Sequence, residues 1–115
     1  MSESEQTTEE IRDISEVAAI EVINTLAVHL LSAIAVKLGL SDTPTAADDV
    51  DLDEARKLIN ALAGLVTASA PDLGDHHARA LRDGLRTVQL AFREESAIPD
   101  APGKGPGEKW TGAVN

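Results

Sequence analysis

The sequence contains no cysteine and no tyrosine, and its only large aromatic residues are Phe92 and Trp110. Without cysteine the chain can form neither a disulfide nor a thiolate metal site. With so few aromatic rings it lacks the stacking platform on which proteins bind single-stranded nucleic acids. Its core must therefore consist of Ala, Leu, Ile and Val side chains, packed closely through the small ones.

Basic residues are scarce as well. Ten Lys and Arg stand against 20 Asp and Glu, so the formal net charge is −10. A chain of this charge repels the phosphates of DNA and RNA. We therefore expect no nucleic-acid partner.

The sequence also lacks motifs for catalysis or cofactor binding. Gly103–Gly107 reads GKGPG, but no strand precedes it and no helix follows it, as a phosphate-binding loop requires. No Ser or Thr stands in a nucleophile motif. His76 and His77 are adjacent, so on a helix they point about 100° apart and do not chelate an ion as residues i and i+4 do, and His29 is distant. We predict no metal, no cofactor and no enzymatic activity.

Charge is absent between Glu21 and Lys37, within the apolar stretch from Val17 to Leu40. A helix here carries apolar side chains around most of its girth, which is typical of a helix buried on several sides. One apolar face follows helical spacing and consists of Ile20, Ile23, Ala27, Leu30, Ile34 and Leu38. Off that face, Val22, Leu26, Ala33 and Val36 are apolar too, and Glu21, Thr25, His29 and Ser32 form a narrow polar stripe.

This helix is shorter than a membrane span. The charge-free run Val22–Val36 has 15 residues, whereas a span needs roughly 20. The chain begins with MSESEQTTEE, which is acidic where a secretory signal peptide carries Lys or Arg. We predict no membrane span and a cytoplasmic protein.

Two further helices are predicted after the apolar one. The first runs from about Leu52 to Ala70 and ends at Pro71, and the second runs from Gly74 or Asp75 to about Glu95. Helices joined by so short a turn pack antiparallel. The fold class is therefore all-α: a three-helix bundle with a long apolar first helix, an antiparallel hairpin and disordered termini.

Local signals support these boundaries. Gly39 is expected to end the first helix as a left-handed cap. Asp51 and Glu54 stand three residues apart, as in a capping box at the start of the second helix. Gly64 lies inside that helix, where glycine costs about 1 kcal/mol relative to alanine, so we expect another helix to approach closely there.

The two ends of the chain differ from its centre. We expect residues 1–12 to be a disordered acidic arm and residues 13–97 to be a single helical domain. Residues 98–115 contain four Gly and three Pro, and we expect a flexible tail without a regular element. Trp110 in this tail either packs back on the protein's own helices or is a short motif that another protein binds.

Arginines recur along the last predicted helix at Arg79, Arg82, Arg86 and Arg93. This basic stripe is either a solvated face paired with nearby acids or a surface for an anion or an acidic partner. Arg79, Arg82 and Arg86, together with Trp110, are our candidates for binding a partner.

Three segments, AVHLLSAIAVKLGL, DLDEARKLINALAGLV and LRDGLRTVQLAFRE, resemble a small bacterial domain family of unknown function. The shared features are Leu38-Gly39, the Leu/Ala/Ile spacing after Leu52, and Phe92-Arg93. The tail Pro102–Lys109 resembles the PGxGPGEK-type tail of actinobacterial members. Thr67–Gly74 departs from the turn common in the family. The resemblance implies no activity, substrate or cofactor.

The first helix has more apolar surface than two neighbouring helices can cover. We therefore predict a homodimer or higher oligomer, with the helical face from Ile20 to Leu38 at the contact. The function we expect is a noncatalytic interaction or adaptor module. The alternative is a carrier of a small apolar ligand or lipid, and an enzyme is the function we expect least.

Overall fold

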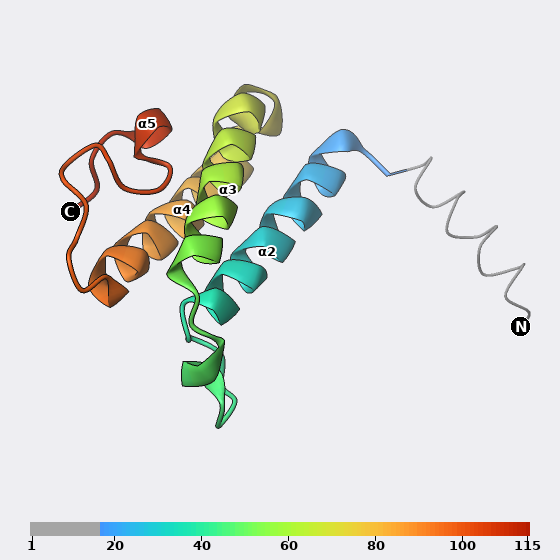
Figure 1. Cartoon of the computed structure of the whole chain (residues 1–115). Coiled ribbons are helices and arrows are strands. Elements are labelled where there is room, and N and C mark those ends of the chain that lie inside the picture. The colour runs from blue at the N-terminus through green and yellow to red at the C-terminus, as the bar shows by residue number, and fades with distance from the viewer. Residues whose placement is uncertain (1–16) are drawn as a thin grey trace, which may run out of the picture.

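The computed structural model describes residues 17–115, and in this range the chain is helical without a strand. Its elements are α2 (Ala19–Lys37), the 3₁₀ helix η1 (Ala46–Asp49), α3 (Leu52–Leu73), α4 (Asp75–Glu95) and α5 (Glu108–Thr111). The α3–α4 hairpin lies between α2 on one side and the C-terminal segment (residues 98–115), which contains α5, on the other (Figure 1). The predicted all-α three-helix architecture is confirmed. The predicted acidic arm, residues 1–12, lies outside the described residues.

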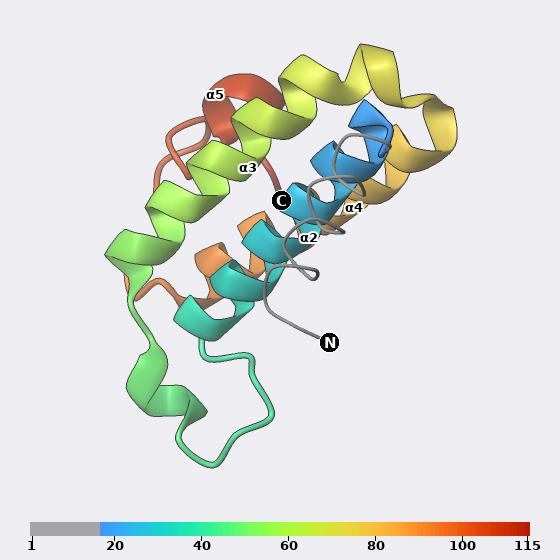
Figure 2. The same cartoon turned by 90° about the vertical axis from the view of Figure 1, so that its right-hand side faces the viewer.

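The core forms where α2, α3 and α4 meet. Its largest fully buried side chains are aliphatic: Ile34, Leu38, Ile59, Leu62 and Val66. Phe92 of α4 is the one aromatic side chain in this core among the described residues. The turned view shows α2 alongside both helices of the hairpin, with the loop from α2 to α3 projecting away from the bundle (Figure 2).

α2 ends at Lys37 in a left-handed cap, as predicted from Gly39. Gly39 has φ +76°, and its N–H donates to the Val36 carbonyl at 3.0 Å. The Leu40 N–H reaches back to the Ala35 carbonyl at 2.9 Å, which completes a Schellman motif. A side chain at Gly39 would meet Val50, because an added Cβ would lie 2.7 Å from its Cγ2 atom.

α3 begins as predicted and ends later than predicted. The Asp51 side chain accepts a hydrogen bond from the Glu54 N–H at 3.1 Å, so Asp51 is the N-cap. The prediction that Pro71 ends the helix is wrong, because α3 continues to Leu73. Pro71 lacks the N–H that would bond to the Thr67 carbonyl and its ring crowds that oxygen, yet the helix continues for two more residues. The helix breaks at Gly74, whose φ of +77° is left-handed.

Two glycines inside the long helices admit close neighbours. On Gly84 of α4, an added Cβ would lie 3.1 Å from the Leu31 side chain of α2. On Gly64 of α3, it would lie 3.5 Å from the Trp110 ring. The predicted close approach at Gly64 therefore exists, and the approaching group is Trp110 of α5 rather than one of the long helices.

Candidate functional site

The C-terminal segment folds back on the hairpin and is held by two side-chain amides. Gln89 of α4, only 3% exposed, donates through Nε2 to the Pro106 carbonyl and to Thr111 Oγ1, each at 3.1 Å. Asn60 of α3 accepts a hydrogen bond from the Gly107 N–H at 2.8 Å. The segment is thus attached to both helices.

Glu108 closes the segment on itself. This carboxylate is 6% exposed, and its two oxygens accept the backbone N–H groups of Gly105 and Val114, each at 2.7 Å. The prediction that residues 98–115 form no regular element is therefore wrong for Glu108–Thr111. Glycines supply the turns, and the buried carboxylate satisfies amides that a Gly/Pro-rich chain leaves without helical partners.

Asp100 joins the start of this segment to the two long helices. Its carboxylate forms a salt bridge with Arg56 of α3 at 2.9 Å. Its carbonyl oxygen accepts a hydrogen bond from Arg93 of α4 at 3.2 Å. Arg93, one of the four arginines of the predicted basic stripe, therefore helps to hold the C-terminal segment against α4.

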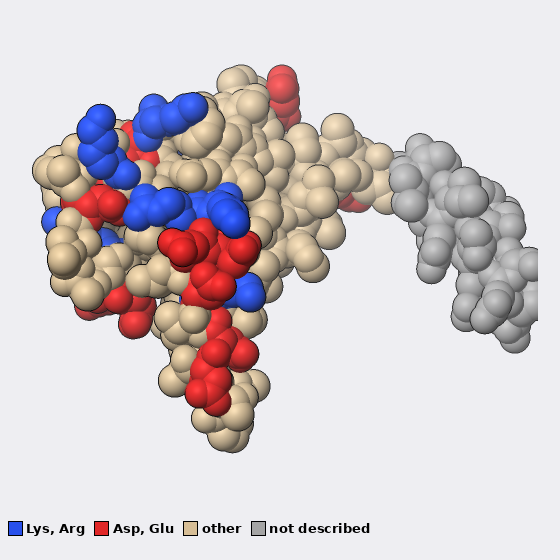
Figure 3. Space-filling view, in the orientation of Figure 1, with Lys and Arg blue, Asp and Glu red and all other residues tan. Residues whose placement is uncertain are grey.

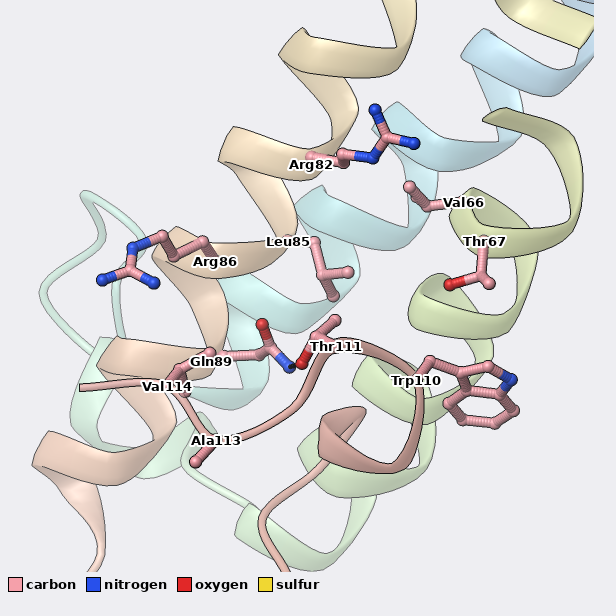
Figure 4. Close-up of a pocket in the computed structure, with 10 residues that line it drawn as sticks. All are labelled: Val66, Thr67, Arg82, Leu85, Arg86, Gln89, Trp110, Thr111, Ala113 and Val114. Carbon is pink, nitrogen blue, oxygen red and sulfur yellow. Dashed lines mark hydrogen bonds between the residues drawn. The ribbon is translucent and has the colours of Figure 1, made fainter. Parts of the chain in front are cut away.

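A groove of about 400 Å³ remains between the C-terminal segment and the hairpin (Figure 4). Val66 and Leu85, both buried, form its apolar floor. The remaining lining residues are Thr67, Arg82, Arg86, Gln89, Trp110, Thr111, Ala113 and Val114. Three segments distant in the sequence therefore meet in one concave surface.

The groove brings together most of the predicted partner-binding residues. Arg82, Arg86 and Trp110 line it, whereas Arg79 lies on the exposed surface of α4 outside the lining. Trp110 is 40% exposed, and Lys109 Nζ lies 4.6 Å from the centre of its ring. Of the two alternatives for Trp110, the structure therefore places it against the protein's own helices with part of the ring accessible.

The electrostatic character of the groove differs from that of the whole chain. No acidic side chain lines it, and within residues 17–115 Arg79, Arg82 and Arg86 form no salt bridge with an Asp or Glu side chain. Arg86 donates to the backbone oxygen of Asn115 at 2.9 Å. Acidic side chains gather instead along the loop that projects from the bundle, while Lys and Arg gather nearer the C-terminal segment (Figure 3).

Sequence reasoning missed three residues that build this groove: Asn60, Gln89 and Glu108. A signal existed for Gln89, which stands one turn after Leu85 at the edge of the buried stripe of α4. Noncovalent binding is the chemistry that this lining supports, through guanidinium groups, a hydroxyl and apolar surface. In the described part of the chain, no group of three or more His, Cys, Asp or Glu could hold a metal ion.

A second feature is the side of α2 that faces away from the hairpin. Val22, Leu26 and Val36 are exposed there, and Leu26 is 52% exposed. By length and composition α2 also passes as a membrane span, a test that buried core helices and N-terminal signal sequences pass too, and it is the one helix of residues 17–115 that does.

The residues predicted as an oligomer contact occupy the opposite side. Ala27, Ile34 and Leu38 are at most 1% exposed inside the chain's own core. Ile20, Ile23 and Leu30 are partly buried against that core. Within this fold, Ala27, Ile34 and Leu38 are therefore not accessible to a second copy, because α3 and α4 cover them, whereas the other three residues are covered only in part.

The fold and the groove define a small three-helix domain with a C-terminal segment folded onto its hairpin. Residues 19–94 match the model of a family described as a domain of unknown function (DUF1844), and the chain belongs to that family. The match extends from the start of α2 almost to the end of α4, so the C-terminal segment lies beyond it. Comparison with curated proteins and with solved structures gave no match.

Proposed function

We propose that this protein is a noncatalytic interaction module that self-associates through the outer side of α2. The observation that supports this most strongly is a line of mostly apolar side chains on α2, along a part of the helix, residues 22–36, that carries no charge. We call this line the outer stripe, and it consists of Val22, Leu26, His29, Ala33 and Val36. Of these, Val22, Leu26 and Val36 are large exposed hydrophobic residues. Burial of such surface is the main driving force of association.

The spacing of the outer stripe suits a second helix. Its residues follow one another at four, three, four and three positions, and Leu40 continues the series beyond the helix. This alternation is the seam along which two helices pack side chains into each other's gaps. His29 is the one polar member and stands near the middle of α2.

A second copy of the chain is the occupant that fits this stripe best. The stripe has no charge that would select a partner of opposite sign, and apolar residues flank His29 on both sides, as a two-fold symmetric contact requires. α2 has 19 residues and is about 28 Å long. One helix face is smaller than the roughly 800 Å² per partner of a standard interface, so we expect a micromolar Kd.

Insertion of α2 into a membrane would require a different fold. Ala27, Ile34 and Leu38 would have to leave the core that they form with α3 and α4. Asn24, Thr25, His29 and Ser32 would then enter the hydrocarbon region at a cost. Contact between copies leaves the bundle intact.

The test compares two substitutions at positions of equal exposure on α2. Leu26 is 52% and Val28 51% exposed, and they point about 160° apart around the helix. In sedimentation velocity at about 5–100 µM, the wild type and Val28→Asp should associate equally, whereas Leu26→Asp should be monomeric. The proposal would be refuted if the wild type stayed monomeric over this concentration range, or if both variants lost self-association to the same extent. So would co-flotation of the wild type with phosphatidylcholine and phosphatidylglycerol vesicles.

The proposal also covers where the protein is located and which activities and partners it lacks. We propose a cytoplasmic protein without catalytic activity, cofactor or nucleic-acid partner, from the actinobacterial branch with the PGxGPGEK-type tail. The adaptor function is preferred to the carrier function because the groove of about 400 Å³ is open to solvent rather than enclosed. Native mass spectrometry that finds a bound lipid would favour the carrier instead.

A further inference from the structure

We propose that the groove beside Trp110 binds an acidic peptide segment of a partner protein, with an apolar side chain between two carboxylates. This goes beyond self-association, because the groove and the outer stripe are on different surfaces. α2 and the C-terminal segment lie on opposite sides of the hairpin (Figure 1). A dimer formed through α2 would thus leave both grooves open.

The floor and one wall of the groove suit an apolar side chain. Val66 and Leu85 are at most 2% exposed and form a fixed aliphatic floor between α3 and α4. Trp110 stands at the edge with part of its ring accessible. A partly exposed Trp next to a preformed apolar pocket is a common anchor of protein interfaces, because its burial adds a large apolar area.

The two arginines suit two separate carboxylates rather than one phosphate. Both stand on α4 one turn apart, and their guanidinium groups diverge: Arg82 points toward the α3 side of the groove, whereas Arg86 points the opposite way, away from Val66 and Trp110 (Figure 4). Arg82 forms no hydrogen bond or salt bridge with residues 17–115, whereas one Arg86 nitrogen already donates to the backbone oxygen of Asn115. A planar guanidinium group pairs with a carboxylate through two parallel hydrogen bonds.

The groove itself is adapted to an extended ligand. Its volume of about 400 Å³ is within the range of ligand pockets, and it is open along the surface. Gln89 is already committed to Pro106 and Thr111, so the side-chain polar groups that remain are the two arginines, the Thr67 hydroxyl and the indole N–H of Trp110. Charge complementarity selects the partner, because no acidic side chain lines the groove to repel a carboxylate.

The experiment uses the full chain and a peptide of about twelve residues in which Glu and Leu alternate, labelled with fluorescein. We expect saturable binding by fluorescence anisotropy. With the unlabelled peptide, we expect a shift of tryptophan emission to shorter wavelength, which reports on the groove because Trp110 is the only tryptophan. A peptide with Gln in place of Glu should not bind.

Substituted variants distinguish binding in the groove from general electrostatic attraction of the peptide to the basic surface of α4. Arg82→Gln and Arg86→Gln should each weaken binding about fivefold, as expected for exposed ion pairs. Arg79→Gln removes the same charge from the same helix outside the groove and should change nothing. Leu26→Asp should also keep full binding, since it alters only the outer stripe. Arg82 is the primary position because it makes no contact on which the fold depends.

Several results would overturn the proposal. Absence of binding at millimolar peptide, or unchanged affinity in Arg82→Gln, would do so. An equal loss of peptide affinity in Arg79→Gln would show that the peptide is attracted to the basic surface of α4 in general and not to the groove. An equal emission shift with inorganic phosphate would show a simple anion site, and loss of binding in Leu26→Asp would place the peptide on α2.

Discussion

The ring of Trp110 lies over Gly64 of α3, where a Cβ built on the glycine would be 3.5 Å from the indole Cζ2 atom. That distance is ordinary van der Waals contact, so the glycine leaves room for a methyl group and for little more. The pair joins the C-terminal segment to the middle of α3. It also sets the edge of the groove, because Trp110 is one of its lining residues.

Two substitutions at Gly64 should therefore have opposite effects. Gly64→Ala should stabilise the protein by up to about 1 kcal/mol, because alanine is the better helix former and its methyl group fits under the ring. Gly64→Leu should displace Trp110 and shift its emission to longer wavelength. Urea unfolding and fluorescence measure both effects. A destabilised Gly64→Ala variant would show that the ring lies closer to the helix than described.

Gly107 should tolerate no side chain. It has φ +75°, and a Cβ there would lie 2.9 Å from both Ala63 Cβ and Gln89 Nε2. Gly107→Ala should cost about 2–3 kcal/mol in urea unfolding, since backbone strain and overpacking add. Gly103 has φ +82° and nothing within 4 Å, so Gly103→Ala should cost about 1 kcal/mol from strain alone. If both substitutions lowered the free energy of unfolding equally, the close contacts around Gly107 would contribute nothing to the cost of a side chain there.

Removal of the Glu108 carboxylate should loosen the C-terminal segment. Glu108→Ala leaves the Gly105 and Val114 amides without their acceptor. We expect the free energy of unfolding to fall by about 2–3 kcal/mol. Amide hydrogen exchange should accelerate at both residues, while the core of α3 stays protected. Glu94→Ala, at an exposed position of α4, is the control and should have no effect. Unchanged amide exchange at Gly105 and Val114 in Glu108→Ala would show that this carboxylate does not hold the C-terminal segment in place.

His29 should limit the strength of self-association. It is the one polar residue of the outer stripe, so His29→Leu should tighten the proposed dimer about tenfold by adding apolar area to the contact. Val28→Leu adds a methylene group on another side of α2 and should leave the Kd unchanged. Sedimentation equilibrium measures both constants. A weaker or unaltered dimer in His29→Leu would place the contact elsewhere.

Several parts of this fold could be predicted from local patterns. The spacing of apolar residues identified three helices, and Gly39 and Asp51 marked two of their ends, because caps depend on a few neighbouring atoms. The end of α3 was misjudged at Pro71, since a proline in the last turn removes one hydrogen bond while Gly74 changes the direction of the chain. The family was recognised from the three helical segments that it covers, and the tail is beyond its match.

By itself, the sequence determined that the protein is all-α, acidic and built around one apolar helix, because helical periodicity and charge are local properties of a chain. Only the tertiary structure decided which side of that helix is covered: Ala27 and Ile34 are buried in the core, and Leu26 is exposed. It also decided that the Gly/Pro-rich tail forms a groove with Arg82. Both outcomes depend on contacts between residues far apart in the chain, such as Gln89 with Pro106 and Asn60 with Gly107, and no local pattern encodes such pairs.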